Sequence, residues 1–121
     1  MKAWKQFEAD AAALFNGKRF WANSGERLDF EGELQRAVSG AGGVHLVPVR
    51  VRGQCKLVQK LSLEQLTALA EEQGVDVVCV KVRRGSGRPS PALVVFTFDN
   101  YRRLHALPQV PDVRSVQAVR G

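Results

Sequence analysis

Residues 49–58, VRVRGQCKLV, place an amide and an ammonium group two positions apart in an alternating run. Apolar side chains alternate with polar ones, which predicts a strand with one buried face and one polar face. Gln54 and Lys56 fall on the polar face, beside Arg50 and Arg52. An amide oxygen is a hard ligand of the kind that Mg²⁺ accepts, and a lysine can steady an attacking water or a phosphate. The polar face therefore meets either water or a substrate.

A second alternating run precedes this one and is predicted to pair with it. Residues 28–38 alternate apolar and polar side chains, and the glycine-rich SGAGG at 39–43 predicts a turn. Two such runs joined by a short turn form a β-hairpin. If Ser39 pairs with Val44, the numbers of paired residues sum to 83.

This register brings further charged residues to the polar face. Asp29 is predicted to lie opposite Gln54, and Arg27 opposite Lys56, with Glu31 next along. Directly paired residues point to the same face of a sheet. The expected cluster depends on the absence of a β-bulge, because one extra residue would shift the register.

A carboxylate, an amide oxygen and a lysine on one face suggest metal-assisted hydrolysis. Asp29 and Gln54 are the candidate metal ligands, and Lys56 is the candidate group for activating water or stabilising a phosphate. Glu8 would complete the metal shell if the N-terminal helix packs across the sheet. The alternative is a solvated strand face with cross-strand ion pairs, and spacing alone leaves both interpretations open.

The remaining chain predicts the elements that would position this face. A helix is predicted over 3–15 with Gly17 as its cap, and a second helix begins after Ser62, with Gln65 in capping-box position. Other predicted elements are a short strand at 18–21, buried strands at 75–82 and 92–98, and a last helix capped by Asp99. The order predicts an α/β (α+β) fold with a mixed central sheet, a long hairpin and flanking helices.

The motifs, taken in order, resemble those of PD-(D/E)XK nucleases, and within them the small Holliday junction resolvases of archaea and their phages. The matching pieces are KQFEADAAALF with Glu8, the NSG loop with Ser24, Asp29 at the start of a strand, and QCK with Gln54 and Lys56. The helix SLEQLTALAEE and the strand VDVVCVKV follow, so the resemblance covers roughly residues 3–105.

The resemblance implies a restriction-endonuclease-like fold and a Mg²⁺-dependent endodeoxyribonuclease, for which Mn²⁺ can substitute. It implies four-way or other branched DNA as substrate, hydrolysis of phosphodiester bonds, and a homodimer that cuts symmetric strands. Ser24 would contact the metal-bound phosphate. The strand at 92–98 and the last helix are the expected sources of a dimer surface.

Two departures from the family pattern keep a non-catalytic alternative open. The usual Glu-x-Lys is Gln-x-Lys here, as in Mrr-type restriction endonucleases, and the chain from Asp29 to Gln54 is long. An amide removes one negative charge from the metal site. A DNA-binding protein that retains the nuclease fold is therefore the alternative function. A Mrr-like restriction domain is disfavoured, because 121 residues leave no room for a separate target-recognition domain.

Composition bounds the class of protein and its partners. The 121 residues are enough for one domain, expected over 1–108, followed by a loosely held tail at 109–121. The net charge is +6 and the pI is about 9.9, which favours a polyanionic partner. The candidate phosphate contacts are Arg27, Arg50, Arg52, Arg83, Arg84 and Arg88.

Two cysteines, no signal-peptide pattern and no membrane-length apolar run predict a soluble protein of a reducing bacterial, archaeal or phage-infected cytoplasm. Cys55 and Cys79 both fall at apolar positions of strand-like runs, so they are expected to be small core residues.

Overall fold

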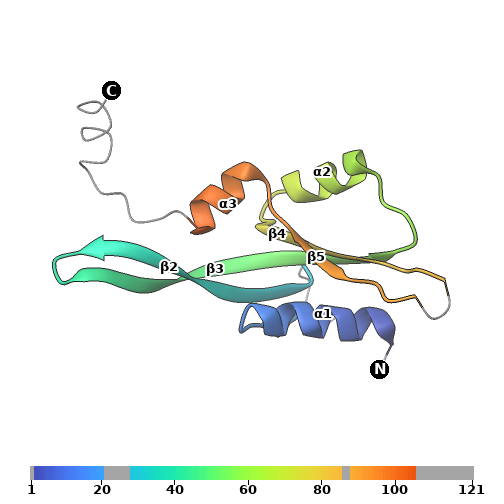
Figure 1. Cartoon of the computed structure of the whole chain (residues 1–121), viewed down its shortest axis with the longest axis horizontal. Coiled ribbons are helices and arrows are strands. Elements are labelled where there is room, and N and C mark those ends of the chain that lie inside the picture. The colour runs from blue at the N-terminus through green and yellow to red at the C-terminus, as the bar shows by residue number, and fades with distance from the viewer. Residues whose placement is uncertain (1, 21–27, 86–87, 106–121) are drawn as a thin grey trace.

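The protein folds as a five-stranded mixed β-sheet with helices on both sides, which confirms the predicted α+β class (Figure 1). The computed structural model describes residues 2–20, 28–85 and 88–105. The strands lie in the order β1-β2-β3-β4-β5. The elements in chain order are α1 (Ala3–Leu14), β1 (Lys18–Arg19), β2 (Phe30–Gly40), β3 (Gly43–Val58), α2 (Leu63–Glu71), β4 (Val77–Val82), β5 (Ala92–Val95) and α3 (Phe98–His105).

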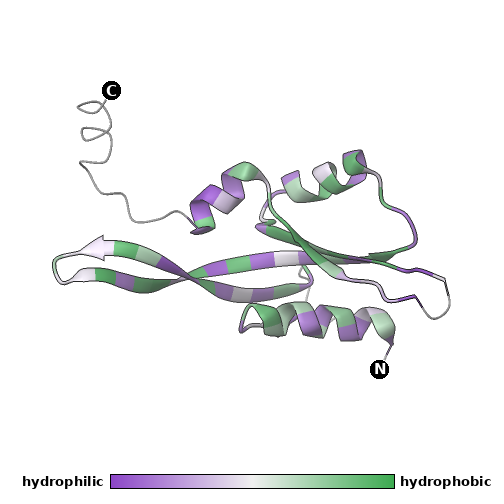
Figure 2. Ribbon diagram, in the orientation of Figure 1, coloured by the Kyte–Doolittle hydropathy of each residue, from purple (hydrophilic) through white to green (hydrophobic). Residues whose placement is uncertain are grey.

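Strands β2 and β3 form a long antiparallel hairpin in the predicted register. Ser39 pairs with Val44, and the pairing continues without a shift to Phe30 opposite Gly53. Polar and apolar residues alternate along both strands (Figure 2). The closed end of this hairpin projects past α1 as an arm (Figure 1), and every residue from 41 to 48 is exposed. Glycine residues at the turn set the register, because a two-residue loop fixes which residues face each other.

Strands β3 and β4 are parallel, and α2 makes the crossover between them, whereas β4 and β5 are antiparallel. A parallel pair needs such a crossover because the chain must return to the same end of the sheet. Helix α2 begins with the predicted capping box, in which Ser62 and Gln65 exchange side chain to backbone hydrogen bonds of 3.0 and 2.9 Å.

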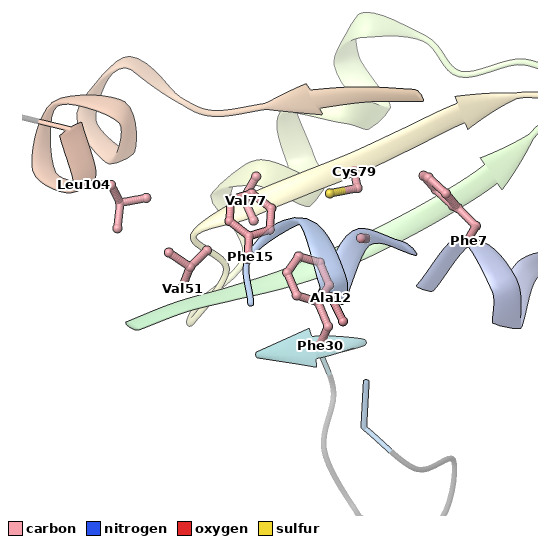
Figure 3. Packing of buried hydrophobic residues seen from close by; sticks show 9 residues of the cluster. Phe7, Ala12, Phe15, Phe30, Val51, Val77, Cys79 and Leu104 are labelled. Atoms are coloured by element: carbon pink, nitrogen blue, oxygen red, sulfur yellow. The ribbon is translucent and has the colours of Figure 1, made fainter. Parts of the chain in front are cut away.

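Two hydrophobic cores lie on the two faces of the sheet. The core on the α1 side, which we call the α1-side core, is shown in Figure 3 and consists of Phe7, Ala11, Ala12, Phe15, Phe30, Val51, Val77, Cys79 and Leu104. The smaller core beneath α2, the α2-side core, consists of Leu28, Ala70, Val75, Val78 and Val80. Alternate residues of β4 therefore enter different cores, as the period of two in a strand requires.

The C-terminal elements differ from the sequence prediction. Strand β5 ends at Val95, and Ala92, Leu93 and Val94 are exposed, so the expectation of a buried strand over 92–98 is wrong. Apolar residues need a covering element to be buried, and within the described residues β5 pairs with β4 alone. The cap of α3 is Thr97, whose hydroxyl accepts the backbone N–H of Asn100 at 3.0 Å, rather than Asp99.

Helix α1 begins at the predicted Ala3 but ends at Leu14, one residue before the predicted end, and its C-terminus is not capped as predicted. Asn16, and not Gly17, takes the left-handed conformation after the helix, with φ of 52°. Gly17 is needed for another reason, since a Cβ there would lie 1.8 Å from the carbonyl oxygen of Glu31. None of the helices in the described part of the chain has the length and apolarity to cross a bilayer.

Candidate functional site

Strand β3 places the predicted site residues Gln54 and Lys56 on the face opposite to that of Cys55. Cys55 packs against the α1-side core. Its neighbours Gln54 and Lys56 face α2, where Gln54 bonds to Glu72 and Lys56 lines a pocket against the helix. Because side chains alternate along a strand, these two residues cannot share a face with Cys55.

Asp29 lies with Cys55 and not with Gln54, so the predicted cluster of Asp29, Gln54 and Lys56 is wrong. The ladder ends at Phe30, and the Asp29 N–H bonds instead to the Gly53 carbonyl at 2.9 Å. The chain changes faces here, because Leu28 enters the α2-side core and Phe30 enters the α1-side core. Two residues apart in a regular strand would share one face, so the strand is irregular at Asp29.

The Asp29 carboxylate is held by the backbone of β3. Its Oδ2 accepts the Cys55 N–H at 2.7 Å, a short distance typical of a charge-assisted hydrogen bond. Asp29 thus anchors the end of the sheet at the point where the regular ladder stops.

Glu8 of α1 completes a carboxylate pair on this face. Partial burial, followed by the nearby negative charge of Asp29, raises the pKa of Glu8 above its ordinary value. Arg19 of β1 opposes this shift through an ion pair, with Nε 3.1 Å from Glu8 Oε1. Helix α1 therefore packs across the sheet and brings Glu8 near Asp29, while the role of Glu8 as a metal ligand stays a prediction.

Two free thiols border the carboxylate pair. Cys55 and Cys79 are register partners on the parallel strands β3 and β4. Contact with Cys79 and burial raise the pKa of the Cys55 thiol, with smaller contributions from Asp29 and Glu8. Cys55 is therefore a neutral thiol at physiological pH. Both residues pack with the α1-side core, as expected for small core residues.

Gln54 and Lys56 belong to a separate polar region under α2. Gln54 is 8% exposed, and its Nε2 donates to Glu72 Oε2 at 2.9 Å, while its Oε1 finds no hydrogen-bond partner within the described residues. Lys56 and Lys60 line an open pocket of about 400 Å³ against α2. This region offers cations and one carboxylate, and it is separated from Asp29 by the sheet.

The predicted Mg²⁺ ligands therefore do not meet at one point. Glu8 and Asp29 lie together, but the Gln54 amide points to the other face. Across the residues that the structure describes, no group of three His, Cys, Asp or Glu side chains is arranged to hold a metal ion. The set of Asp29, Gln54 and Glu8 does not fit a single hexacoordinate ion.

A glycine stands where a side chain would otherwise enter the α1-side face. A Cβ on Gly53 would lie 2.3 Å from the Phe30 ring and 2.9 Å from Val77 Cγ1. The Phe30 ring fills the space beneath β3, and it stacks on Phe15 with centroids 5.6 Å apart. Close packing of these rings thus excludes any ligand-bearing side chain at position 53.

The predicted phosphate-binding arginines divide into paired and unpaired groups. Arg50 forms an ion pair with Glu31 at 2.9 Å, and Arg52 lies over the Phe20 ring at 5.9 Å. The other three, in the segment between β4 and β5, are exposed and form no ion pair among the residues described: Arg83, Arg84 and Arg88. Ser24 and Arg27 lie outside the described residues, as does the tail expected at 109–121.

Sequence reasoning missed Arg19 and Glu72 as the direct partners of predicted site residues. Arg19 lies on a two-residue strand, too short for alternation to be recognised, and Glu72 follows a helix whose docking the sequence does not specify. The sequence does predict the face on which Cys55 lies, because Cys55 is an even number of residues away from the core residue Val51 on the same strand.

Comparison of this chain with protein-family models, with curated proteins and with solved structures gave no match in any of the three. The functional argument therefore rests on the geometry of the site. One face of the sheet carries a carboxylate pair with two thiols, the other carries a lysine-lined pocket, and the arginines beyond β4 form no ion pair among the described residues.

Proposed function

We propose that this protein binds DNA without cleaving it, on a fold of the restriction-endonuclease-like type. The observation that carries the proposal is the separation of Gln54 and Lys56 from Glu8 and Asp29 by the sheet. Phosphodiester hydrolysis of the expected kind needs the metal ligands and the lysine at one phosphate. Without that convergence the fold and the basic charge remain, and both suit binding.

The arrangement of elements supports the fold part of this proposal. A helix, three antiparallel strands, a crossover helix and a parallel strand occur in the order that the nuclease resemblance implies. The resemblance implies acidic residues on the first helix and at the start of the second strand, and Glu8 of α1 and Asp29 before β2 agree with that expectation.

The basic residues support the binding part. The chain carries a net charge of +6. Arg83, Arg84 and Arg88 are exposed, and no described carboxylate neutralises them. Unpaired cations release counterions from DNA on binding, whereas a cation already held by a glutamate first loses that partner.

A metal-dependent, Holliday junction resolvase-like endonuclease is the second candidate, and the Glu8–Asp29 pair favours it. Two adjacent carboxylates are hard ligands, and Mg²⁺ is commonly held by one or two of them together with waters. Branched DNA as substrate and a homodimer belong to this candidate. Its difficulty is that Lys56 lies across the sheet, so an attacking water would need another activating group.

The experiment that separates the candidates incubates the full chain with a labelled four-way junction and with linear duplex, in Mg²⁺, Mn²⁺ or EDTA. We expect retarded complexes and intact DNA in all conditions. Metal-dependent cleavage that is lost in Asp29→Asn would establish the endonuclease and overturn the non-catalytic proposal.

Binding itself is tested by salt titration of the Arg83→Ala/Arg84→Ala/Arg88→Ala variant. If all three arginines contact phosphates, the log–log slope against salt should fall in magnitude by about 2 to 3, at about 0.9 for each contact. Arg50→Ala is the control, because Glu31 already holds that cation. A slope unchanged in the triple variant would remove this segment from the DNA-binding surface.

A further inference from the structure

A groove between β5 and α3 brings exposed aromatic side chains next to Arg102, which has no ion pair among the described residues. It has a volume of about 650 Å³ and is lined by Val94, Phe96, Phe98, Tyr101, Arg102 and His105. Phe98 is 88% exposed and Tyr101 is 57% exposed. Side chains of this size are seldom left so open in a folded domain unless they meet a partner.

Three of the four rings that line the groove contact one another: Phe96, Tyr101 and His105. Tyr101 stacks on His105, with centroids 4.4 Å apart and an interplanar angle of 26°. Phe96 meets both rings edge-on, at 5.9 and 5.0 Å. His105 Nδ1 lies 3.2 Å from the Tyr101 carbonyl oxygen, which ties this stack to the helix. The groove therefore presents an ordered aromatic surface, so little side-chain entropy is lost on binding.

The charge beside these rings is positive. Arg102 is exposed and has no ion-pair partner in the described part of the chain, whereas its neighbour Arg103 is held by Asp76. None of the six residues that line the groove is acidic. The groove thus combines aromatic rings with a guanidinium that no described carboxylate holds.

We propose that this groove binds an unpaired nucleotide of single-stranded DNA, with the base stacked on the aromatic side chains and the flanking phosphate on Arg102. Rings beside an arginine are the groups that bind unpaired bases, because every base has a face that stacks and a phosphate that pairs. The inference rests on the proposed DNA-binding function and adds the form of DNA that this surface takes.

Two other occupants agree less well with the groove. In duplex DNA the base faces are covered by their neighbours, so the exposed rings would gain no stacking. A second copy of this chain meeting the same surface across a two-fold axis would bring the two Arg102 side chains toward each other. That repulsion is absent when the occupant supplies the negative charge.

The test measures binding of a single-stranded oligonucleotide that contains 2-aminopurine, whose fluorescence is quenched when the base stacks. We expect quenching by the parent chain, and Tyr101→Ala should abolish it and weaken binding about 5- to 150-fold, the range for loss of one base–aromatic stack. Tyr101→Phe retains the ring and should bind as the parent does. Leu93→Ala is the matched control, because this exposed residue lies outside the groove.

Salt dependence separates the two contacts. Arg102→Ala should lower the magnitude of the log–log slope by about 0.7, the value for one phosphate of a single strand, whereas Tyr101→Ala should leave the slope unchanged. Lys18→Ala, which removes an exposed cation of β1 with no assigned DNA contact, serves as the control for loss of one positive charge elsewhere. Thermal unfolding of each variant verifies that the fold is retained.

The outcomes also distinguish this inference from the proposed function. Duplex binding by the parent, combined with single-strand binding that Tyr101→Ala does not weaken, would overturn the groove and leave the DNA-binding proposal in place. No DNA binding of either form would overturn both. A dimer in sedimentation that Phe98→Ala converts to a monomer would assign the groove to self-association and overturn the inference.

Discussion

The polar groups on the two sides of β3 differ in how they are paired. On the α1 side, Asp29 is bound to a backbone N–H and Glu8 to Arg19. On the α2 side, Lys56 has no ion pair within the described residues, and the Gln54 Oε1 has no hydrogen bond there. The two carboxylates of the first face are paired, whereas the second face combines the Arg50–Glu31 ion pair with Lys56 and the buried Gln54 Oε1, which have no such partner among the described residues.

The difference shows what a spacing of two residues in a strand can predict. It predicts that the two side chains share a face, but it does not predict which residues of neighbouring segments lie on that face. Gln54 and Lys56 share a face wherever β3 is placed, because a strand has a period of two. A shift of one residue in a neighbouring segment transfers a partner to the other face. Asp29 makes that transfer, since the ladder stops at Phe30 and Gly53.

The largest predicted effect comes from a substitution that disturbs the packing of the α1-side face. Gly53→Ala places a Cβ about 2.3 Å from the fully buried Phe30 ring, and we expect a loss of about 3 kcal/mol in the free energy of unfolding. Urea unfolding measures it. Gly42→Ala is the control, because its nearest contact would be an ordinary 3.6 Å and the cost should stay within about 0.5 kcal/mol. Equal stability of the two variants would contradict the packing described for the α1-side face.

A smaller effect compares the faces directly. Asp29→Ala leaves the Cys55 N–H without its acceptor, so we expect a loss of about 1–3 kcal/mol. Asp29→Asn should cost less, because its side-chain oxygen still accepts. Lys56→Ala, across the sheet, should change stability by less than about 0.5 kcal/mol. If Lys56→Ala proves as destabilising as Asp29→Ala in urea, the contrast between the faces is incorrect.

The smallest effect is a pH dependence from Glu8. Because its pKa is raised in the folded state, the folded chain binds this proton more tightly than the unfolded chain does. The resulting stabilisation is present below pH 4.5 and is lost as pH rises through the folded pKa. Relative to the parent, Glu8→Gln should therefore gain stability between pH 4 and pH 7. The exposed Glu64→Gln variant is the control, and a parent-to-variant difference that is constant with pH would contradict the raised pKa.

The hairpin register was predictable because the glycine turn and the alternation specify one pairing, and Ser39 does pair with Val44. The position of Asp29 was not. Leu28 and Phe30 are both apolar, and alternation alone places them in one core, whereas packing sends them to two. The exposure of β5 could not be predicted from the sequence for a similar reason, because an apolar run does not reveal whether another element covers it.

The hairpin arm also has a consequence for association between chains. Its strands pair with each other, and Glu33 N–H points outward to the Phe15 carbonyl, so alternate residues direct their backbone groups to the open edges. By the same alternation Pro48, opposite Gln35, occupies an outward position, where an ordinary residue would offer a donor. Proline offers none. Pro48 therefore weakens pairing between the open edge of the arm and a strand of another chain. This protects the arm against edge-to-edge aggregation.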